Sequence, residues 1–268
     1  MRIAYFGFDL FAECLARATA EHTVTDVFTF DVDGVFDFNS SIIAEAKRVK
    51  ARVHTKPATP DQVAALDVDV IVAAGYAHKI PMPATLKGIN VHPTLLPLGR
   101  GRWPLPRVLL SDREAAGVTI HKLVHKWDAG DILAQEKIAL GDDDDLETLT
   151  MKLKRAAPDM LSHVLRSLDR AWDNARPQSA SAYWPMPKYE DRLLDFKQPV
   201  ADVLRVVRAF SKFESAAEIE GVIYGVTRAN GWVEEHAFAP GTKVIESSRE
   251  LLIAAKDGFV VLQEWKRA

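Results

Sequence analysis

The most constraining feature of the sequence is the regular alternation of short β-prone runs with helix-like segments through its first half. The run Val68–Ala73 consists mostly of valine and isoleucine, as expected for a strand that is buried on both faces. Strands that alternate with helices pair in parallel through right-handed crossovers. We therefore expect a doubly wound, mostly parallel α/β sheet. The predicted strands are Arg2–Gly7, Thr23–Phe30, Arg52–His54, Val68–Ala73 and Ile89–His92, and the predicted helices are Phe8–Thr19, Ile42–Lys50 and Pro60–Leu66.

Several local features follow from capping, proline and periodicity rules. Ser40 or Ser41 is expected to cap the helix that starts at Ile42, with Glu45 completing a capping box. Pro93 is expected to end the strand at His92. Two later strands are expected to pair with each other, and a long helix after them is expected to break near its proline. These elements are the strands Gly117–His125 and Ile132–Leu140 and the helix from Leu146 to about Trp172, with the break near Pro158.

The sequence changes character at residues 174–187, where Pro, Ser and Gln replace the helical period. We expect a linker there, between a first domain over residues 1–173 and a second over 188–268. The second begins with an amphipathic helix at Val200–Phe210 and continues in short alternating runs separated by turn pairs such as Asn230-Gly231 and Pro240-Gly241. This pattern predicts a small C-terminal β domain, an OB-like barrel.

Composition excludes several classes of protein. Hydrophobic residues make up 48% of the 268 residues and the net charge is −3, which excludes wholesale disorder and argues against binding through bulk nucleic-acid electrostatics. The single cysteine, Cys14, cannot form an internal disulfide and falls on the apolar side of a predicted helix, so we expect a packed core thiol. No run of about 20 apolar residues and no leader pattern occurs, and we expect a cytoplasmic protein.

Three polar residues carry the chemistry of the first half. Asn90 and His92 lie two apart on one predicted strand, so their side chains share a face at the end of a sheet strand where α/β sheets bind ligands. Asp128 follows a later strand and precedes Gly130. An amide and an imidazole can stabilise the oxyanion of a tetrahedral intermediate, and a carboxylate can help to take a proton from an attacking amine. Together they suit acyl transfer to an amine.

The sequence that flanks these residues indicates a more specific reaction. The segment INVHPTLLPLGRGRWPLP followed by GVTIHKLVHKWDAGDIL resembles the folate-dependent formyltransferase family. The resemblance is close over 90–133, and a weaker similarity to methionyl-tRNA formyltransferase and sugar N-formyltransferases runs through the whole chain. It implies a Rossmann-like catalytic domain that uses 10-formyltetrahydrofolate and needs no metal.

The resemblance also assigns residue roles. Asn90 and His92 would polarise the formyl carbonyl, and Asp128 would order the site and relay the proton. The segment at Ala73–Ile80 matches the pterin-side loop of the family, where Gly75 and Tyr76 would offer mostly backbone contacts. Ala73, Gly75, Tyr76 and Asp131 are therefore the expected donor-binding residues. In the purely structural alternative, the Tyr76 ring packs over the loop with its hydroxyl in water.

The Arg-Gly turn of the family stands beside the acceptor site, and here it reads Arg100, Gly101, Arg102, Trp103. These four residues are the expected acceptor-binding residues, because a cation and an indole there could grip a phosphate and stack on a base or sugar. The other histidines of this region, His121 and His125, are expected to be structural or solvent-facing.

The sequence indicates the identity of the acceptor amine less clearly than it indicates the reaction. The tRNA-modifying relatives carry a basic insertion in the early catalytic domain, whereas this chain has Asp31, Asp33 and Asp37 there and no Lys or Arg between Arg17 and Lys47. An acidic segment repels phosphate. We therefore favour a small amine, such as that of a nucleotide-linked amino sugar or another metabolite.

The alternative functions differ from this hypothesis in the acceptor or in the class of protein. Methionyl-tRNA formyltransferase and a hydrolase of 10-formyltetrahydrofolate would use the same three residues, and a non-catalytic folate-binding module would not need them. A dehydrogenase is disfavoured because Gly7 lacks a glycine-rich phosphate motif around it. The chain could also form a homo-oligomer, and no membrane partner is expected.

Overall fold

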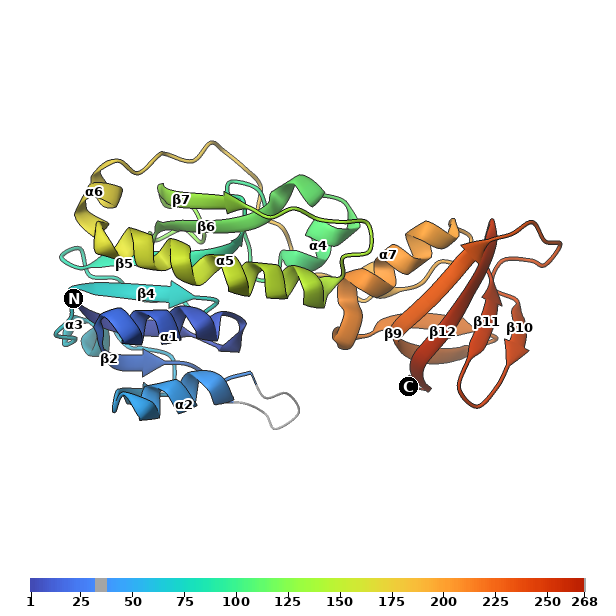
Figure 1. Cartoon of the computed structure of the whole chain (residues 1–268), viewed down its shortest axis with the longest axis horizontal. Coiled ribbons are helices and arrows are strands. Elements are labelled where there is room, and N and C mark those ends of the chain that lie inside the picture. The colour runs from blue at the N-terminus through green and yellow to red at the C-terminus, as the bar shows by residue number, and fades with distance from the viewer. Residues whose placement is uncertain (32–37, 268) are drawn as a thin grey trace. The chain divides into compact units, whose positions relative to one another are not determined.

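The structure is a computed structural model that describes residues 1–31 and 38–267. The chain divides into two compact units (Figure 1). The first unit comprises Met1–Pro104, Glu114–Ala139 and Thr150–Trp184, and the second comprises Leu105–Arg113, Leu140–Leu149 and Pro185–Ala268. Each unit has its own sheet and its own hydrophobic core.

The first unit is built on a seven-stranded sheet in the order β3-β2-β1-β4-β5-β6-β7. The strands are β1 Arg2–Gly7, β2 Thr23–Phe28, β3 Arg52–His54, β4 Val70–Ala74, β5 Lys87–Thr94, β6 Ala116–Lys122 and β7 Ile132–Lys137. Pairing is parallel from β3 to β5 and antiparallel from β5 to β7. The expected mostly parallel, Rossmann-like sheet is therefore confirmed. Its order reverses between β1 and β4, which is where open α/β sheets bind ligands.

The centre of this sheet is apolar because its strands are covered on both faces. All five residues of β4 are buried, as the valine-rich sequence predicts. On one face Phe6 of β1 stacks on Phe28 of β2 with ring centroids 4.3 Å apart, and Tyr76 meets Phe6 edge-on at 5.2 Å. Cys14 is also buried, as expected for a packed core thiol, and burial raises the pKa of this thiol.

The helices of the first unit start and end differently from the expectation in several places. They are α1 Ala12–Glu21, α2 Ser40–Arg48, α3 Pro60–Ala64, α5 Leu146–Arg166, which enters this unit at Thr150, and α6 Leu168–Asp173. The expected serine cap and Glu45 capping box of α2 are wrong, because the Asp9 carboxylate accepts from the N–H groups of Ser41 and Ile42 at 3.0 Å each. A capping box forms instead at Thr59 of α3.

Two prolines are tolerated where the sequence suggested a break. Helix α5 continues through Pro158 and ends at Arg166, since an interior proline removes one backbone hydrogen bond but need not end a packed helix. Strand β5 likewise continues through Pro93 to Thr94. The pairing of β5 with β6 shifts register between His92 and Thr94, and proline without an N–H fits such an irregularity.

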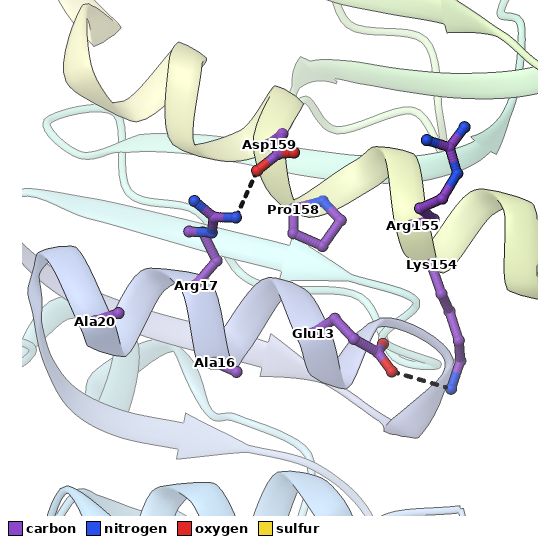
Figure 2. A pocket seen from close by; sticks show the side chains of 8 residues that line it. All are labelled: Glu13, Ala16, Arg17, Ala20, Lys154, Arg155, Pro158 and Asp159. Atoms are coloured by element: carbon purple, nitrogen blue, oxygen red, sulfur yellow. Dashed lines mark hydrogen bonds and ion pairs between the residues drawn. The ribbon is translucent and has the colours of Figure 1, made fainter.

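A shallow depression of about 390 Å³ lies where α1 and α5 run side by side (Figure 2). Arg17 pairs with Asp159 at 2.5 Å and Lys154 with Glu13 at 3.6 Å. The side chains of Arg17, Glu13 and Asp159 are exposed, that of Lys154 is partly buried, and all four are already paired, so the depression is a surface seam between two helices. None of the residues predicted to carry chemistry lines it.

The second unit packs two helices, α4 Leu105–Leu110 and α7 Val200–Phe210, with a five-stranded antiparallel sheet in the order β10-β11-β12-β9-β8. The strands are β8 Ser215–Ile219, β9 Val222–Val233, β10 Lys243–Glu246, β11 Leu251–Ala254 and β12 Gly258–Arg267. Val203 and Val207 of α7 share a buried cluster with Tyr224 and Val260. The antiparallel β domain is thus confirmed, while closure into an OB-like barrel stays a prediction.

The expected turn at Asn230-Gly231 is wrong, because β9 runs through it as one strand paired with β12. A Cβ on Gly231 would lie 2.6 Å from the Phe259 carbonyl oxygen, so the glycine permits a close strand approach rather than a turn. Gly241, by contrast, has a φ of +88° and does lie in the expected turn.

Candidate active site

The polar cluster of the first unit begins with the pairing of β5 and β6. Asn90 and His92 point to the same face of β5, and Asn90 lies opposite His121 in the ladder, next to the pair of His92 with Thr119. His92 is 4% exposed and His121 is 1% exposed. The structure therefore places two predicted residues and one additional histidine together on β5 and β6, in a patch where both histidines are buried and Asn90 is half-buried.

The two ring nitrogens of His92 have different partners. Nε2 lies 2.8 Å from the Gly99 carbonyl oxygen, which can only accept, so Nε2 carries the proton. Nδ1 faces Asp128 Oδ1 at 3.6 Å. Burial lowers the pKa of His92, and nearby His121 lowers it further, while Asp128 and the Gly99 carbonyl oppose the change. His92 is thus neutral at neutral pH, and the Nδ1 lone pair faces the carboxylate.

Asp128 lies between β6 and β7 with a φ of +49°, an uncommon backbone conformation for a residue with a side chain. Its Oδ2 accepts from the Gly101 N–H at 2.9 Å. Burial alone would raise its pKa, but His92, His121 and the Gly101 N–H together lower the pKa to about 2. The carboxylate is therefore ionised at neutral pH although it is only 9% exposed.

His121 is a site residue that the sequence reasoning missed, and its burial rules out solvent exposure. Its Nδ1 donates to the Lys122 carbonyl oxygen at 2.8 Å, which leaves Nε2 to accept from Asn90 Nδ2 at 3.0 Å. Nε2 also lies 3.7 Å from Asp128 Oδ1. One signal could have found it: a histidine on the strand that pairs with the Asn-x-His strand. His125, in contrast, is exposed.

The residues of the turn at 99–103 differ in exposure and in hydrogen-bond partners. Gly101 contributes its N–H to Asp128, and a Cβ there would lie 2.5 Å from the Trp184 carbonyl oxygen. Arg100 is 8% exposed, and its guanidinium donates to Gln178 Oε1 at 2.7 and 3.1 Å and to the Ser179 carbonyl at 3.2 Å. Arg102 is exposed and Trp103 is partly buried. Acceptor contacts by these residues stay a prediction.

The expected donor-binding residues lie at the carboxyl end of β4, apart from Asp131. Ala73 is buried in β4, and Gly75 follows it with a φ of +75° and the Phe8 ring 2.6 Å from where a Cβ would be. Tyr76 is 8% exposed and burial raises the pKa of its hydroxyl, so the expectation that this hydroxyl lies in water is wrong. Asp131 pairs with Lys122 at 3.1 Å. Donor binding at these four residues stays a prediction.

The described residues form neither a metal-binding cluster nor a membrane-spanning helix. No group of three or more His, Cys, Asp or Glu side chains in the described part of the chain is arranged to hold a metal ion. Among the same residues, no helix is long and apolar enough to cross a bilayer.

The cluster combines one hydrogen-bond donor with a group of proton acceptors. One N–H of the Asn90 amide goes to His121, and the amide has a second N–H to offer. His92 Nδ1 and Asp128 Oδ1 both present lone pairs at 3.6 Å from each other. Such a site can stabilise a developing oxyanion and take up a proton.

Comparisons with known proteins identify the family of both parts of the chain. Residues 14–165 match the family model described as formyl transferase, and residues 187–268 match formyl transferase, C-terminal domain. A methionyl-tRNA formyltransferase of Treponema denticola is 36% identical over 157 residues, which cover 56% of this chain and 48% of that protein. The match therefore spans about half the length of this curated relative.

Two solved structures share the fold. HypX from Aquifex aeolicus in complex with tetrahydrofolic acid superposes with a TM-score of 0.74 at 19% identity, covering 100% of this chain and 44% of HypX. An N-formyltransferase from Helicobacter canadensis, in complex with folinic acid and dTDP-3-aminofucose, gives a TM-score of 0.74 at 16% identity and covers 98% of this chain and 99% of that one. With the family model matching more than half of its residues, the chain belongs to the formyl transferase family.

Proposed function

We propose that the chain is an N-formyltransferase that moves a formyl group from 10-formyltetrahydrofolate to a primary amine. The observation that carries the proposal is the cluster of half-buried Asn90 with buried His92 and Asp128, in which an amide that has a second N–H to offer stands beside a neutral imidazole and an ionised carboxylate. Family membership and the folate ligands of two structural neighbours support the donor.

The reaction requires one oxyanion donor and one proton carrier. The amine nitrogen bonds to the formyl carbon, the bond from that carbon to N10 breaks, and one proton passes from the amine to N10. Asn90 donates its second N–H to the formyl oxygen as negative charge develops there. His92 Nδ1 takes up the amine proton and later releases it toward N10.

Asp128 makes His92 a better proton acceptor. Its Oδ1 lies 3.6 Å from His92 Nδ1 and stabilises the imidazolium that forms when the proton arrives. The Gly101 N–H donates to the other carboxylate oxygen, Oδ2, and so fixes the orientation in which Oδ1 faces the histidine. In this arrangement His92 can donate to the oxyanion only after Nδ1 is protonated, and Asn90 is the donor that is ready beforehand.

We place the folate donor at the carboxyl end of β4, because of the backbone groups and aromatic rings found there. The backbone at Gly75 lies where the strand order reverses. The Phe8 ring, which follows β1, lies 5.7 Å from the ring of Phe30 after β2 and 6.4 Å from that of Phe38 before α2, centroid to centroid. Backbone hydrogen-bonding groups beside aromatic surface suit a flat, polar-edged pterin ring. Ala73, Gly75, Tyr76 and Asp131 would form this side of the site.

For the acceptor, we infer a small amine, such as the amino group of a nucleotide-linked sugar. The segment between Arg17 and Lys47 has no cation to offer an RNA phosphate, and Asp31 at its centre is exposed. Asp33 and Asp37 of the same segment lie outside the described residues. The exposed Arg102 and the partly buried Trp103 supply a cation and an indole beside Gly101.

A second acceptor, initiator methionyl-tRNA, is favoured by one observation. The curated relative from Treponema denticola is a methionyl-tRNA formyltransferase, and its similarity to this chain covers 157 residues. Because that match spans 48% of the relative, it supports the shared chemistry more strongly than the shared acceptor.

The experiment that tests the proposal compares acceptors directly. Purified protein is mixed with 10-formyltetrahydrofolate and a panel of nucleotide-linked amino sugars, and the formylated amine is identified by mass spectrometry. The control is the Asn90→Ala variant, which should give no product above the uncatalysed rate. Failure of the wild-type protein to formylate any amine in the panel or methionyl-tRNA would overturn the proposed function.

A further inference from the structure

The segment at residues 176–184, which the sequence reads as part of a linker, lies along the polar cluster of the first unit. Its start pairs with β7 through Arg176 and Ile132, with backbone hydrogen bonds of 2.8 and 2.9 Å. Its end pairs with the turn at 99–103, where the Trp184 N–H donates to the Arg100 carbonyl at 2.8 Å. Between these ends the Tyr183 hydroxyl donates to the Trp127 carbonyl.

Gln178 is the residue of this segment that reaches both loops of the site. Its Nε2 donates to the backbone carbonyl of Asp128 at 2.9 Å and to that of Gly130 at 2.5 Å. Its Oε1 accepts from the Arg100 guanidinium at 2.7 and 3.1 Å. One amide group therefore joins the loop that carries the carboxylate to the turn that carries the Gly101 N–H.

We propose that Gln178 is a positioning residue for formyl transfer, which holds Asp128 against the Gly101 N–H and beside His92. This inference rests on the proposed function for its effect on turnover, but its structural part does not. The loop needs such a hold because Asp128 has a φ of +49°, a conformation that persists only when surrounding contacts impose it.

The chemistry of the site explains why an amide is present at this position. The two backbone carbonyls require a donor, whereas the buried Arg100 requires an acceptor. A primary amide offers both, one at each end, and the longer side chain of glutamine spans the two loops. A carboxylate in the same place would satisfy Arg100 but would face the two carbonyls with a lone pair.

This difference gives a variant that separates positioning from stability. Gln178→Glu keeps the shape of the side chain and strengthens the contact with Arg100, which is a charge-assisted pair in the variant. The same change removes both donors to the Asp128 loop. We therefore expect the melting temperature to stay at the wild-type value or rise, while kcat falls by at least about tenfold, since small misplacement of a catalytic group has large effects on rate.

Hydrogen exchange tests the structural part without any acceptor. In Gln178→Glu the amides of residues 99–102 and 127–131 should exchange faster, led by the Gly101 N–H that Asp128 accepts, while the rest of the sheet keeps its protection. Gln62→Glu on α3 is the matched control, because glutamate also serves the capping-box position. It should leave exchange in both loops and kcat unchanged.

The two readouts keep the proposals distinguishable. Faster exchange in both loops with no formyl transfer even by the wild-type protein would support the positioning and refute the proposed function. Wild-type exchange in Gln178→Glu, or a wild-type kcat with an active enzyme, would overturn the positioning role. A fall in kcat that only follows a fall in melting temperature would also overturn it, as would a fall in folate affinity large enough to explain the loss.

Discussion

Replacing Asp128 by asparagine keeps the shape of the side chain and removes its charge. In the wild-type protein Oδ1 lies 3.6 Å from His92 Nδ1. Coulomb's law at an effective dielectric constant of about 20 gives about 4.6 kcal/mol between this carboxylate and an imidazolium at that distance. A proton that is half transferred in the transition state would lose about half of this, so we expect kcat to fall by about 50-fold, close to the lower end of the usual range for general acid–base groups.

The assay follows tetrahydrofolate formation at saturating donor and acceptor, with the amine that responds best. Affinity for 5-formyltetrahydrofolate, measured by calorimetry, should stay within about threefold of the wild-type value, because the loss falls on proton transfer and leaves ground-state binding intact. Asp169→Asn on α6 is the matched control, since Asp169 is an exposed partner of Lys87 away from the cluster. A kcat within threefold of the wild-type value in Asp128→Asn would refute the reasoning.

Asp128 should also affect stability, with a sign set by its pKa. The pKa falls from its ordinary 3.8 to about 2 in the folded protein, so ionisation contributes about 2 kcal/mol at 1.36 kcal/mol per pKa unit. This contribution is present above pH 3.8 and is lost as the pH falls from 3.8 toward 2. The stability difference between wild type and Asp128→Asn, from urea unfolding at several pH values, should shrink through that window; a constant difference would contradict the assignment.

Three further results are expected. His121→Phe should lower kcat by at least about tenfold because Asn90 loses the acceptor that orients its amide, and His121→Gln should restore part of the rate; equal rates for the two variants would refute this orienting role. Gly130→Ala should unfold the protein or lower its melting temperature sharply, because a Cβ there would lie 1.9 Å from the Lys122 carbonyl oxygen. Cys14 should resist iodoacetamide in the native protein and react after denaturation, since burial raises its pKa; rapid native labelling would contradict that burial.

Much of the first unit follows from the sequence because its signals are local and strong. The valine-rich β4 reads as a doubly buried strand, and Asn90 and His92 fall on one face by strand periodicity alone. Local rules failed where a distant group supplied the missing interaction. The Asp9 carboxylate, for example, replaced the expected serine cap of α2.

The rest of the candidate site depends on contacts between segments far apart in the sequence. Nothing local to Gln178 shows that it bonds the backbone of Asp128, 50 residues earlier, or the side chain of Arg100. The prediction of a linker at residues 174–187 rests on their Pro, Ser and Gln content, which carries no information about such distant contacts. The burial of Arg100 could not be predicted either, because an Arg-Gly turn has the composition of an exposed loop.

The most direct measurement is tetrahydrofolate release from 10-formyltetrahydrofolate in parallel reactions that contain nucleotide-linked amino sugars, charged initiator tRNA or no acceptor. We expect release with a sugar and identification of the formylated amine, with Asn90→Ala and His92→Ala inactive. Release with the tRNA alone would contradict the inferred acceptor, and release without an acceptor would indicate a hydrolase. No release above the uncatalysed rate in any reaction would contradict formyl transfer by this cluster.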